Sequence, residues 1–421
     1  MVASLVLGIS LLDRAEDPPS LLQAVAEGAV QAFPAAEVLL PHPRGIELPP
    51  LPRGVKPIPL EDGSTPEILE VAREEGRDLV VLKADLVPKD KGLLSLWLKG
   101  LLEPLHRGEA GLSVGLLDLH PLERPMGALL LRPLLVSLFS TLLEDSSPEA
   151  FALSRDALAE LLDEAFFKDA SRQATATQLL IRALATGLKA LQVNLGQSPS
   201  RPEPKVGLLR RELKTALNEI LRWEDRWREG TRRTIVPLPR YQAAPGAEPP
   251  EARLDPKPYL SRYRRGFNRF HPLYMGIFPE EIFKELQELA DPARDEFPFS
   301  APLWAEVTFG TLTAFQSSSF DKGDLINGLM VLFYGRLAGF IEELLRWRRR
   351  LEGVQQRQLL LWLIAKQELE AQLQSFLLKK EDFLRGWRQR YKRPLPQVTY
   401  REFIPGVPLV LPHEVVVPGG R

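Results

Sequence analysis

The fold of this chain is decided by the stretch Arg77-Asp78-Leu79-Val80-Val81-Leu82-Lys83-Ala84-Asp85-Leu86-Val87-Pro88. Its central run, residues 79–82, is continuously apolar, which is typical of a parallel strand buried on both faces. The strand ends in the charged tripeptide Lys83-Ala84-Asp85. In open α/β sheets ligands bind beyond the carboxyl ends of the strands, so we expect functional residues at this tripeptide.

Strand and helix patterns alternate on both sides of this stretch. Short apolar runs predict strands, and apolar residues spaced three and four apart predict amphipathic helices. This alternation is typical of βαβ units, so we expect a Rossmann-like α/β domain with a mostly parallel sheet and helices on both faces. The expected strands span residues 3–9, 36–40, 55–57, 79–82, 110–119, 151–154 and 190–195, and the expected helices span 18–33, 65–75, 93–107, 127–143, 155–163 and 174–187.

The character of the chain changes after residue 204. Residues 208–227 predict one amphipathic helix, and residues 234–258 are rich in Pro, Ala and Gly, as linkers are. Further helices are expected at 279–289, 302–316, 322–351 and 354–387. We therefore divide the chain into an α/β domain (1–204), a helix with a linker (205–258), a helical C-terminal domain (259–393) and a Pro-rich extended tail (394–421).

The composition excludes several classes of function. The 54 Lys and Arg residues balance the 55 Asp and Glu residues, so no overall field attracts nucleic acid or an anionic membrane. The lack of Cys excludes disulfides, thiolate nucleophiles and Cys-ligated zinc, and it fits a reducing compartment. With only 4 Met and as many as 38 Pro, the chain has the few labile residues and stiff loops of thermophile proteins.

No segment of the sequence predicts a membrane span. Residues 1–12 lack a basic region and a small-residue cleavage site, so we expect a strand there rather than a signal peptide. The longest apolar run, residues 127–143, is interrupted by Arg132-Pro133 and falls short of the ~20 apolar residues that a span needs. These patterns predict a cytoplasmic protein.

Pieces of sequence spread along most of the chain follow the order found in a known enzyme family. They are Lys83-Ala84-Asp85 after its strand, Gly111-Leu112-Ser113-Val114-Gly115, Arg132-Pro133-Leu134-Leu135, Phe151-Ala152-Leu153-Ser154-Arg155, Leu191-Gln192-Val193-Asn194-Leu195-Gly196, Leu332-Phe333-Tyr334-Gly335-Arg336-Leu337-Ala338-Gly339-Phe340, and Phe376-Leu377-Leu378-Lys379-Lys380-Glu381-Asp382-Phe383-Leu384 with Trp387. The chain resembles GT-A nucleotide-sugar glycosyltransferases, and most of all the retaining group that makes glucosylglycerate and mannosylglycerate. The resemblance implies a UDP- or GDP-hexose donor and a small acidic acceptor such as glycerate or phosphoglycerate.

The metal site of that family is altered in this sequence. The resembling enzymes hold Mg²⁺ or Mn²⁺ with an Asp-x-Asp and a downstream histidine. Here Lys83 stands in place of the first carboxylate, and the segment where the histidine is expected reads Gln197-Ser198-Pro199-Ser200. Asp85 remains as the candidate metal ligand, and a single carboxylate binds a hard cation weakly. Mg or Mn is therefore expected only if the protein is active.

Other positions that the resemblance assigns to ligands have also changed type. On the donor side, Ser10 replaces the start of an Asn-Glu turn, and His42 lies where an acidic, Gly-rich turn is expected. On the acceptor side, Arg172 and Gln173 replace a Gly-Ile-Asp segment. Arg336, beside a helical glycine, could reach a phosphate or carboxylate of the acceptor.

Each of these residues also has a purely structural interpretation. Lys83 either replaces the metal as a diphosphate clamp or is a solvated lysine paired with Asp85 or Asp78, and the second is favoured. His42, between two prolines, is expected to be solvated in an exposed turn. Arg336 is explained equally well by helix packing with an ion pair to Glu342 or Glu343.

Two segments of the second half suggest partners. The basic aromatic residues 259–270 have the composition of a nucleic-acid footprint, but a neutral chain more often docks such a segment onto an acidic face, so no nucleic-acid partner is predicted. The apolar helices at 325–345 and 359–378 suit either a homodimer interface or a core.

Two classes of function stay open. The first is a catalytically degenerate relative that keeps the glycosyltransferase scaffold for a binding, regulatory or assembly role. The second is an active, metal-independent or weakly metal-dependent glycosyltransferase that moves a hexose to a small acidic acceptor. Losing the paired carboxylate, the histidine and both nucleotide turns favours the first. An open polar cleft beyond residues 79–82 favours an enzyme, whereas a cleft filled by Leu11, Leu12 or Pro43 favours a scaffold.

Overall fold

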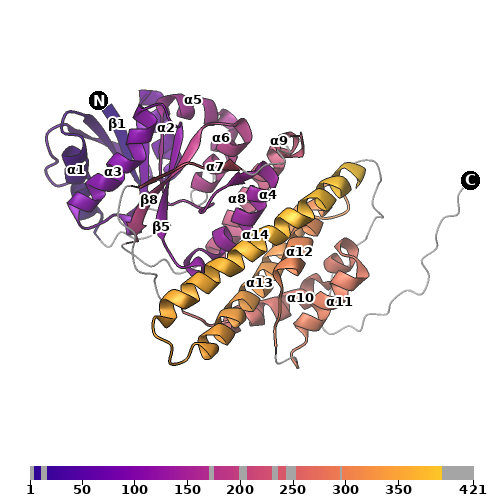
Figure 1. Cartoon of the computed structure of the whole chain (residues 1–421). Coiled ribbons are helices and arrows are strands. Elements are labelled where there is room, and N and C mark those ends of the chain that lie inside the picture. Colours follow the sequence, from indigo (N-terminus) through magenta and orange to yellow (C-terminus); the bar gives the residue numbers. More distant parts are fainter. Residues whose placement is uncertain are drawn as a thin grey trace, which may run out of the picture.

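An eight-stranded sheet organises the described part of the N-terminal half, in the order β3-β2-β1-β4-β7-β5-β8-β10. The structure is a computed structural model that describes residues 4–10, 17–169, 175–198, 206–229, 236–242, 253–293 and 296–390 (Figure 1). The strands of this sheet are β1 (Ser4–Ser10), β2 (Glu37–Pro43), β3 (Val55–Leu60), β4 (Asp78–Lys83), β5 (Leu112–Asp118), β7 (Ala150–Leu153), β8 (Ala190–Gln197) and β10 (Arg240–Gln242). A two-residue pair, β6 (Thr141–Leu142) and β9 (Val236–Pro237), forms a second small sheet.

The predicted organising strand is confirmed as β4, at the centre of the sheet. Its residues 79–82 are buried, and it pairs in parallel with β1. The register places Ser10 opposite Lys83, so both strands end at the same edge. The prediction of an α/β fold with a mostly parallel sheet, followed by a helical C-terminal region, is therefore confirmed.

Strand β7 is antiparallel to both of its neighbours, β4 and β5. The sequence predicted an extended segment here but not its direction. Because β7 runs backwards, its first residue, Ala150, pairs with Leu82 near the carboxyl end of β4. The residue before it, Glu149, therefore reaches the functional edge, where its carbonyl accepts the Lys83 backbone N–H at 3.0 Å.

Helices cover both faces of the sheet. One apolar core joins the sheet to α1 (Pro18–Ala32) and α3 (Lys91–His106). The opposite core contains residues of α2 (Thr65–Glu75), α4 (Arg132–Phe139), α5 (Arg155–Leu161), α7 (Thr175–Thr186) and α8 (Val206–Arg222), with α6 (Glu164–Asp169) and α9 (Glu224–Glu229) beside them. It continues without interruption into the helical domain, so the two parts share one core.

The helical domain consists of α10 (Lys257–Ile277), α11 (Glu280–Ala290), α12 (Ala301–Ala314), α13 (Lys322–Arg350) and α14 (Arg357–Arg390). Figure 1 shows α14 as a long helix that passes the sheet domain, and its packing partners are mainly α12 and α4. A π-helical turn at Gly127–Leu131 leaves the Leu129 carbonyl free to accept from Trp304 Nε1 at 2.6 Å and from Gln372 Nε2 at 2.7 Å. These two hydrogen bonds connect the helical domain to the sheet domain.

Several expected elements differ from those observed. The helix expected at 127–143 ends at Phe139, because Ser140 adopts a left-handed conformation with φ 54°. The segment 259–270 belongs to helix α10, which buries Tyr263 and Phe267 and leaves Arg265 and Arg269 exposed on its other face. The helix placed in the linker, α8, packs on α7 instead and belongs to the shared core.

One helix in the described part of the chain, α13, is long and apolar enough to cross a membrane by length and composition alone. Its apolar window is 83% buried inside the fold, as in a core helix, so core packing explains this helix without a dimer. A single such helix also argues against a protein with several spans. The predictions of a cytoplasmic location, a thermophilic source and a homodimer stay predictions.

Candidate functional site

A cavity of about 170 Å³ opens at the carboxyl ends of β1 and β4. From β1 the chain continues to β2 on one side, while β4 lies on the other side, so this is the switch point of the sheet, where doubly wound folds bind ligands. We call this cavity the charged pocket. Its polar lining residues are Ser10, Thr65, Lys83, Arg124, Ser147, Glu149, Thr175, Thr177 and Glu212.

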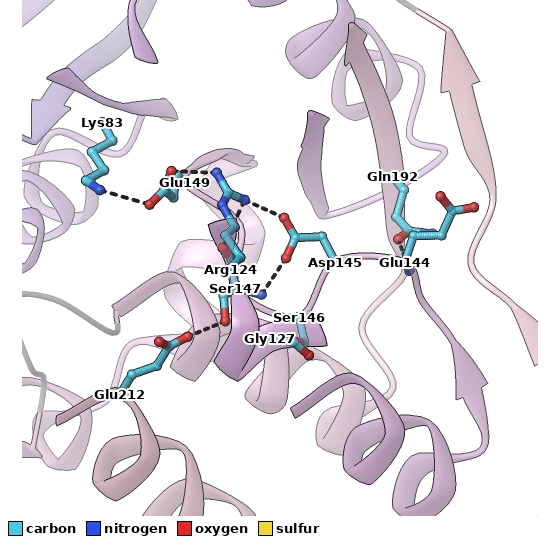
Figure 2. Close-up of polar contacts among 10 residues, drawn as sticks. All are labelled: Lys83, Arg124, Gly127, Glu144, Asp145, Ser146, Ser147, Glu149, Gln192 and Glu212. Atoms are coloured by element: carbon cyan, nitrogen blue, oxygen red, sulfur yellow. Dashed lines mark hydrogen bonds and ion pairs between the residues drawn. The ribbon is translucent and has the colours of Figure 1, made fainter. Parts of the chain in front are cut away.

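A chain of ion pairs crosses the charged pocket (Figure 2). Lys83 Nζ lies 2.9 Å from Glu149 Oε1, and Arg124 Nη2 lies 2.5 Å from Glu149 Oε2. Arg124 then extends the chain, because its Nη1 lies 2.5 Å from Asp145 Oδ2. Two cations are thus matched by two carboxylates.

Local structure holds each member of this network in place. Lys83 is the last residue of β4, and Glu149 immediately precedes β7. Asp145 lies in the turn before β7, where its Oδ1 accepts the Ser147 N–H at 2.8 Å. Arg124 follows a 3-10 turn, Pro121–Glu123, and its Nη1 also donates to the Ser147 carbonyl at 3.3 Å.

The ion pairs favour the charged forms of Lys83, Glu149 and Arg124. Burial alone would lower the pKa of Lys83, but Glu149 and Asp85 outweigh it, so this pKa is raised. Burial alone would raise the pKa of Glu149, but Arg124 and Lys83 lower it. For Arg124 the two carboxylates likewise overcome burial and raise the pKa.

Glu212 enters the pocket from α8 and behaves differently. Burial raises its pKa to about 7, against a hydrogen bond from Ser147 Oγ, while the negative charges of Glu149 and Asp145 raise it further. Figure 2 shows Glu212 directed towards Ser147 and separate from the ion-pair chain. A carboxyl group that titrates near neutral pH beside a cavity is a candidate proton donor or acceptor.

The sequence placed Lys83 and Ser10 in the site, and both line the charged pocket. Ser10 Oγ accepts a hydrogen bond from Thr65 Oγ1 at 3.1 Å. Asp85 lies beside the pocket, with Oδ2 3.5 Å from Lys83 Nζ and its side chain 36% exposed. The favoured interpretation of Lys83, a paired lysine, identified Asp85 correctly, but the closer partner is Glu149.

The residues near Asp85 do not fit a metal ion. Within the described ranges, no three His, Cys, Asp or Glu side chains are grouped so that they could hold one. The ammonium of Lys83 stands next to Asp85 instead. The Mg or Mn site of the resembling enzymes therefore has no counterpart among these residues.

The expectation for His42 needs a correction. It belongs to strand β2 rather than to an exposed turn, it is 8% exposed, and its Nδ1 lies 3.1 Å from the Pro43 carbonyl. Neither His42 nor Pro43 lines the charged pocket. Arg172 and Gln173, like Leu11 and Leu12, lie outside the described residues.

The acceptor-binding role expected for Arg336 is also corrected. Its side chain is buried in the helical domain, where Nε donates to Gln372 Oε1 at 2.6 Å and Nη1 donates to the Phe299 carbonyl at 2.9 Å. A Cβ on the preceding Gly335 would lie 2.7 Å from Tyr263 Cδ2, so the glycine permits close helix packing. The helix-packing interpretation is correct, although neither Glu342 nor Glu343 forms the contact.

Sequence reasoning missed Arg124, Asp145, Glu149 and Glu212. They come from three loops or helices that lie far apart in the sequence, and none carries a recognisable motif. The only available signal was the acidic segment Glu144-Asp145-Ser146-Ser147-Pro148-Glu149, placed before a predicted strand. Comparison of the chain with protein-family models and with curated proteins finds no match.

Proposed function

We propose that this protein is a catalytically degenerate, GT-A-like relative of nucleotide-sugar glycosyltransferases that keeps its pocket for a binding or regulatory role. The observation that carries this proposal is the ion-pair chain of Lys83, Glu149, Arg124 and Asp145. It occupies the end of β4, where the resembling enzymes neutralise a diphosphate.

The charge balance explains why transfer is disfavoured. A departing diphosphate must be neutralised by a metal, an Arg or a Lys. Both cations of the pocket are already matched by carboxylates, and the nearby residues do not fit a metal. Drawing Lys83 towards a ligand breaks its 2.9 Å ion pair with the mostly buried Glu149, which opposes binding. A nucleotide sugar is therefore expected to bind weakly.

The cavity itself supports a binding role rather than a purely structural one. It is open beside β4, and hydroxyl groups of Ser10, Thr65 and Thr177 line it together with the charged side chains. Its place at the switch point of a doubly wound sheet is where small molecules bind in such folds. A pocket that combines hydrogen-bonding groups with apolar walls from Met126, Phe151 and Leu209, and that has no excess positive charge, suits a small ligand with polar and apolar parts.

The alternative function is an active glycosyltransferase that works without a tightly bound metal. Two observations favour it. The cleft beyond β4 is open and carries charged and hydroxyl side chains on part of its wall, and Glu212 can exchange a proton near neutral pH. In this case the donor diphosphate displaces Glu149 and takes Lys83 as its counter-ion.

Calorimetry with UDP-glucose and GDP-mannose, with and without Mn²⁺, separates the two functions. We expect no micromolar binding by the unmodified protein. Glu149→Gln removes the carboxylate that Lys83 and Arg124 share, which frees both cations to face a diphosphate, so it should tighten nucleotide-sugar binding at least tenfold. Glu160→Gln, on an exposed face of α5, is the matched control and should change nothing.

Two outcomes contradict the proposal. Micromolar binding by the unmodified protein that Lys83→Ala abolishes would establish the lysine as a diphosphate clamp. Micromolar binding that requires Mn²⁺ and disappears in Asp85→Ala would show that one carboxylate suffices for the metal. Hexose release from either nucleotide sugar, followed by chromatography, then tests catalysis directly.

A further inference from the structure

A second cavity, of about 140 Å³, lies on the other side of Arg124. The early turns of α14 cover it, and its floor is formed by the carboxyl ends of β5 and β8. We call it the α14 cleft. It shares Arg124 and Gly127 with the charged pocket but contains none of the site residues expected from the sequence.

The acidic side chains of the α14 cleft already have partners. Glu144 Oε1 lies 2.6 Å from Arg240 Nη1, and Asp145 is held by Arg124. Asp118 is also engaged in an interaction. Because these carboxylates are taken, and no metal-binding group exists among the described residues, the cleft does not favour a cation.

Three donors in the cleft have no hydrogen-bond acceptor among the described residues. His120 Nδ1 accepts the Leu122 N–H at 3.2 Å, so its proton resides on Nε2, for which the described residues offer no acceptor. The indole N–H of Trp362 is buried and likewise has no acceptor there. Lys366 Nζ lies 4.2 Å from the centre of the Trp362 ring and has no carboxylate within ion-pair distance in the described ranges.

His120 is a neutral donor around neutral pH. Burial lowers the pKa of His120 to about 4, so the ring is neutral and its Nε2–H remains a donor. Arg240 adds further N–H groups at the rim, because only Nη1 meets Glu144. Apolar side chains, among them Leu117 and Leu369, form the remaining wall.

We propose that the α14 cleft binds a small organic carboxylate, with its oxygens accepting from His120, Trp362 and Lys366 and its short apolar body against Leu369. A carboxylate supplies the acceptors that these three donors lack, and its charge matches the ammonium of Lys366, for which the described residues provide no carboxylate at ion-pair distance. This inference goes beyond the proposed function, because it concerns a cavity that plays no part in holding a nucleotide sugar.

Nuclear magnetic resonance of the full chain with ¹⁵N-labelled tryptophan tests the proposal. Trp362→Phe identifies the Trp362 indole signal among the 7 tryptophans. Titration with sodium propionate should shift this signal saturably, whereas propionamide and sodium chloride should not. Lys366→Gln should weaken propionate binding at least fivefold.

Lys189→Gln is the matched control, because Lys189 is exposed at the opposite, amino-terminal end of β8. It should leave the propionate titration unchanged. The proposal is overturned if propionate gives no saturable shift, if propionamide shifts the indole signal equally, or if Lys366→Gln binds propionate as well as the unmodified protein. None of these outcomes depends on nucleotide-sugar binding in the charged pocket.

Discussion

The charged pocket and the core of the helical domain each contain a mostly buried arginine, but the pKa values of the two arginines are shifted in opposite directions. In the pocket, Arg124 meets the carboxylates of Glu149 and Asp145, which raise its pKa. In the helical core, Arg336 meets only the neutral oxygens of Gln372 and Phe299 at hydrogen-bond distance. Burial lowers the pKa of Arg336 to about 10, against the more distant Glu368 and Glu343.

This difference distinguishes the candidate site from a structural core. Arg336 connects three helical-domain segments, because its Nε and Nη1 donate to Gln372 and to the Phe299 carbonyl. The pocket instead collects several charged groups beside an open cavity, so a ligand can alter their pairing. Burial of an arginine is therefore a poor guide to function unless its partners and the nearest cavity are known.

The largest expected effect is that of Arg336→Ala on stability. The change leaves Gln372 and the Phe299 carbonyl without their donor and creates a cavity, so the free energy of unfolding should fall by about 3 kcal/mol. Urea denaturation measures this decrease in the free energy of unfolding. Arg346→Ala, which breaks only a partly exposed pair with Glu343, should cost under about 1 kcal/mol. An unchanged stability together with altered ligand binding would make Arg336 a binding residue after all.

The next effect concerns Glu212 and pH. Its folded-state pKa of about 7 exceeds the ordinary 4.5, so the folded protein binds the proton more tightly than the unfolded chain. Its contribution to stability is complete below about pH 4.5 and is lost as the pH rises through 7. Glu212→Gln mimics the protonated group.

The measurement compares Glu212→Gln with the unmodified protein in urea denaturation at pH 5 and pH 8. The two proteins should have similar free energies of unfolding at pH 5. At pH 8 the free energy of unfolding of the variant should be higher by about 2–3 kcal/mol. Glu160→Gln, at an exposed position, should have the same free energy of unfolding as the unmodified protein at both pH values. A constant difference across this range would show that Glu212 does not titrate there.

The smallest effect is expected for Asp85→Asn. Asp85 is 36% exposed and lies 3.5 Å from Lys83, which keeps its closer pair with Glu149, so the free energy of unfolding should change by under about 0.5 kcal/mol. Melting temperatures with and without Mn²⁺ should also agree for both proteins. A stabilisation by Mn²⁺ that Asp85→Asn removes would restore the metal site that the resemblance implies.

Local patterns predicted most of the fold. The apolar run 79–82, the helix at 65–75 that ends before Gly76, and the helices of the second half all appear close to their expected positions. Gly76 adopts φ 60°, a conformation that glycine tolerates, so the glycine correctly predicts the end of this helix. Helix α10 escaped prediction because Arg side chains between its aromatic residues obscure the apolar face.

The candidate site was predicted only in part. Lys83 and Ser10 were found because both lie at the ends of recognisable strands. Arg336 was misplaced because a Gly-Arg pair gives no indication of whether the arginine faces a cavity or a core. Sequence spacing does not predict the direction of the Arg336 side chain, because that direction depends on how α13 packs against Phe299 and α14.

The sequence by itself determined the central strand, the lysine at its end and the order of an α/β region followed by a helical region. These follow from apolar periodicity and helix-terminal residues, which act over a few neighbouring positions. Only the tertiary structure decided that β7 runs antiparallel and that Glu149 therefore meets Lys83. The reason is physical: ion pairing and desolvation depend on distance in space, and the direction of a strand sets that distance between residues 66 positions apart.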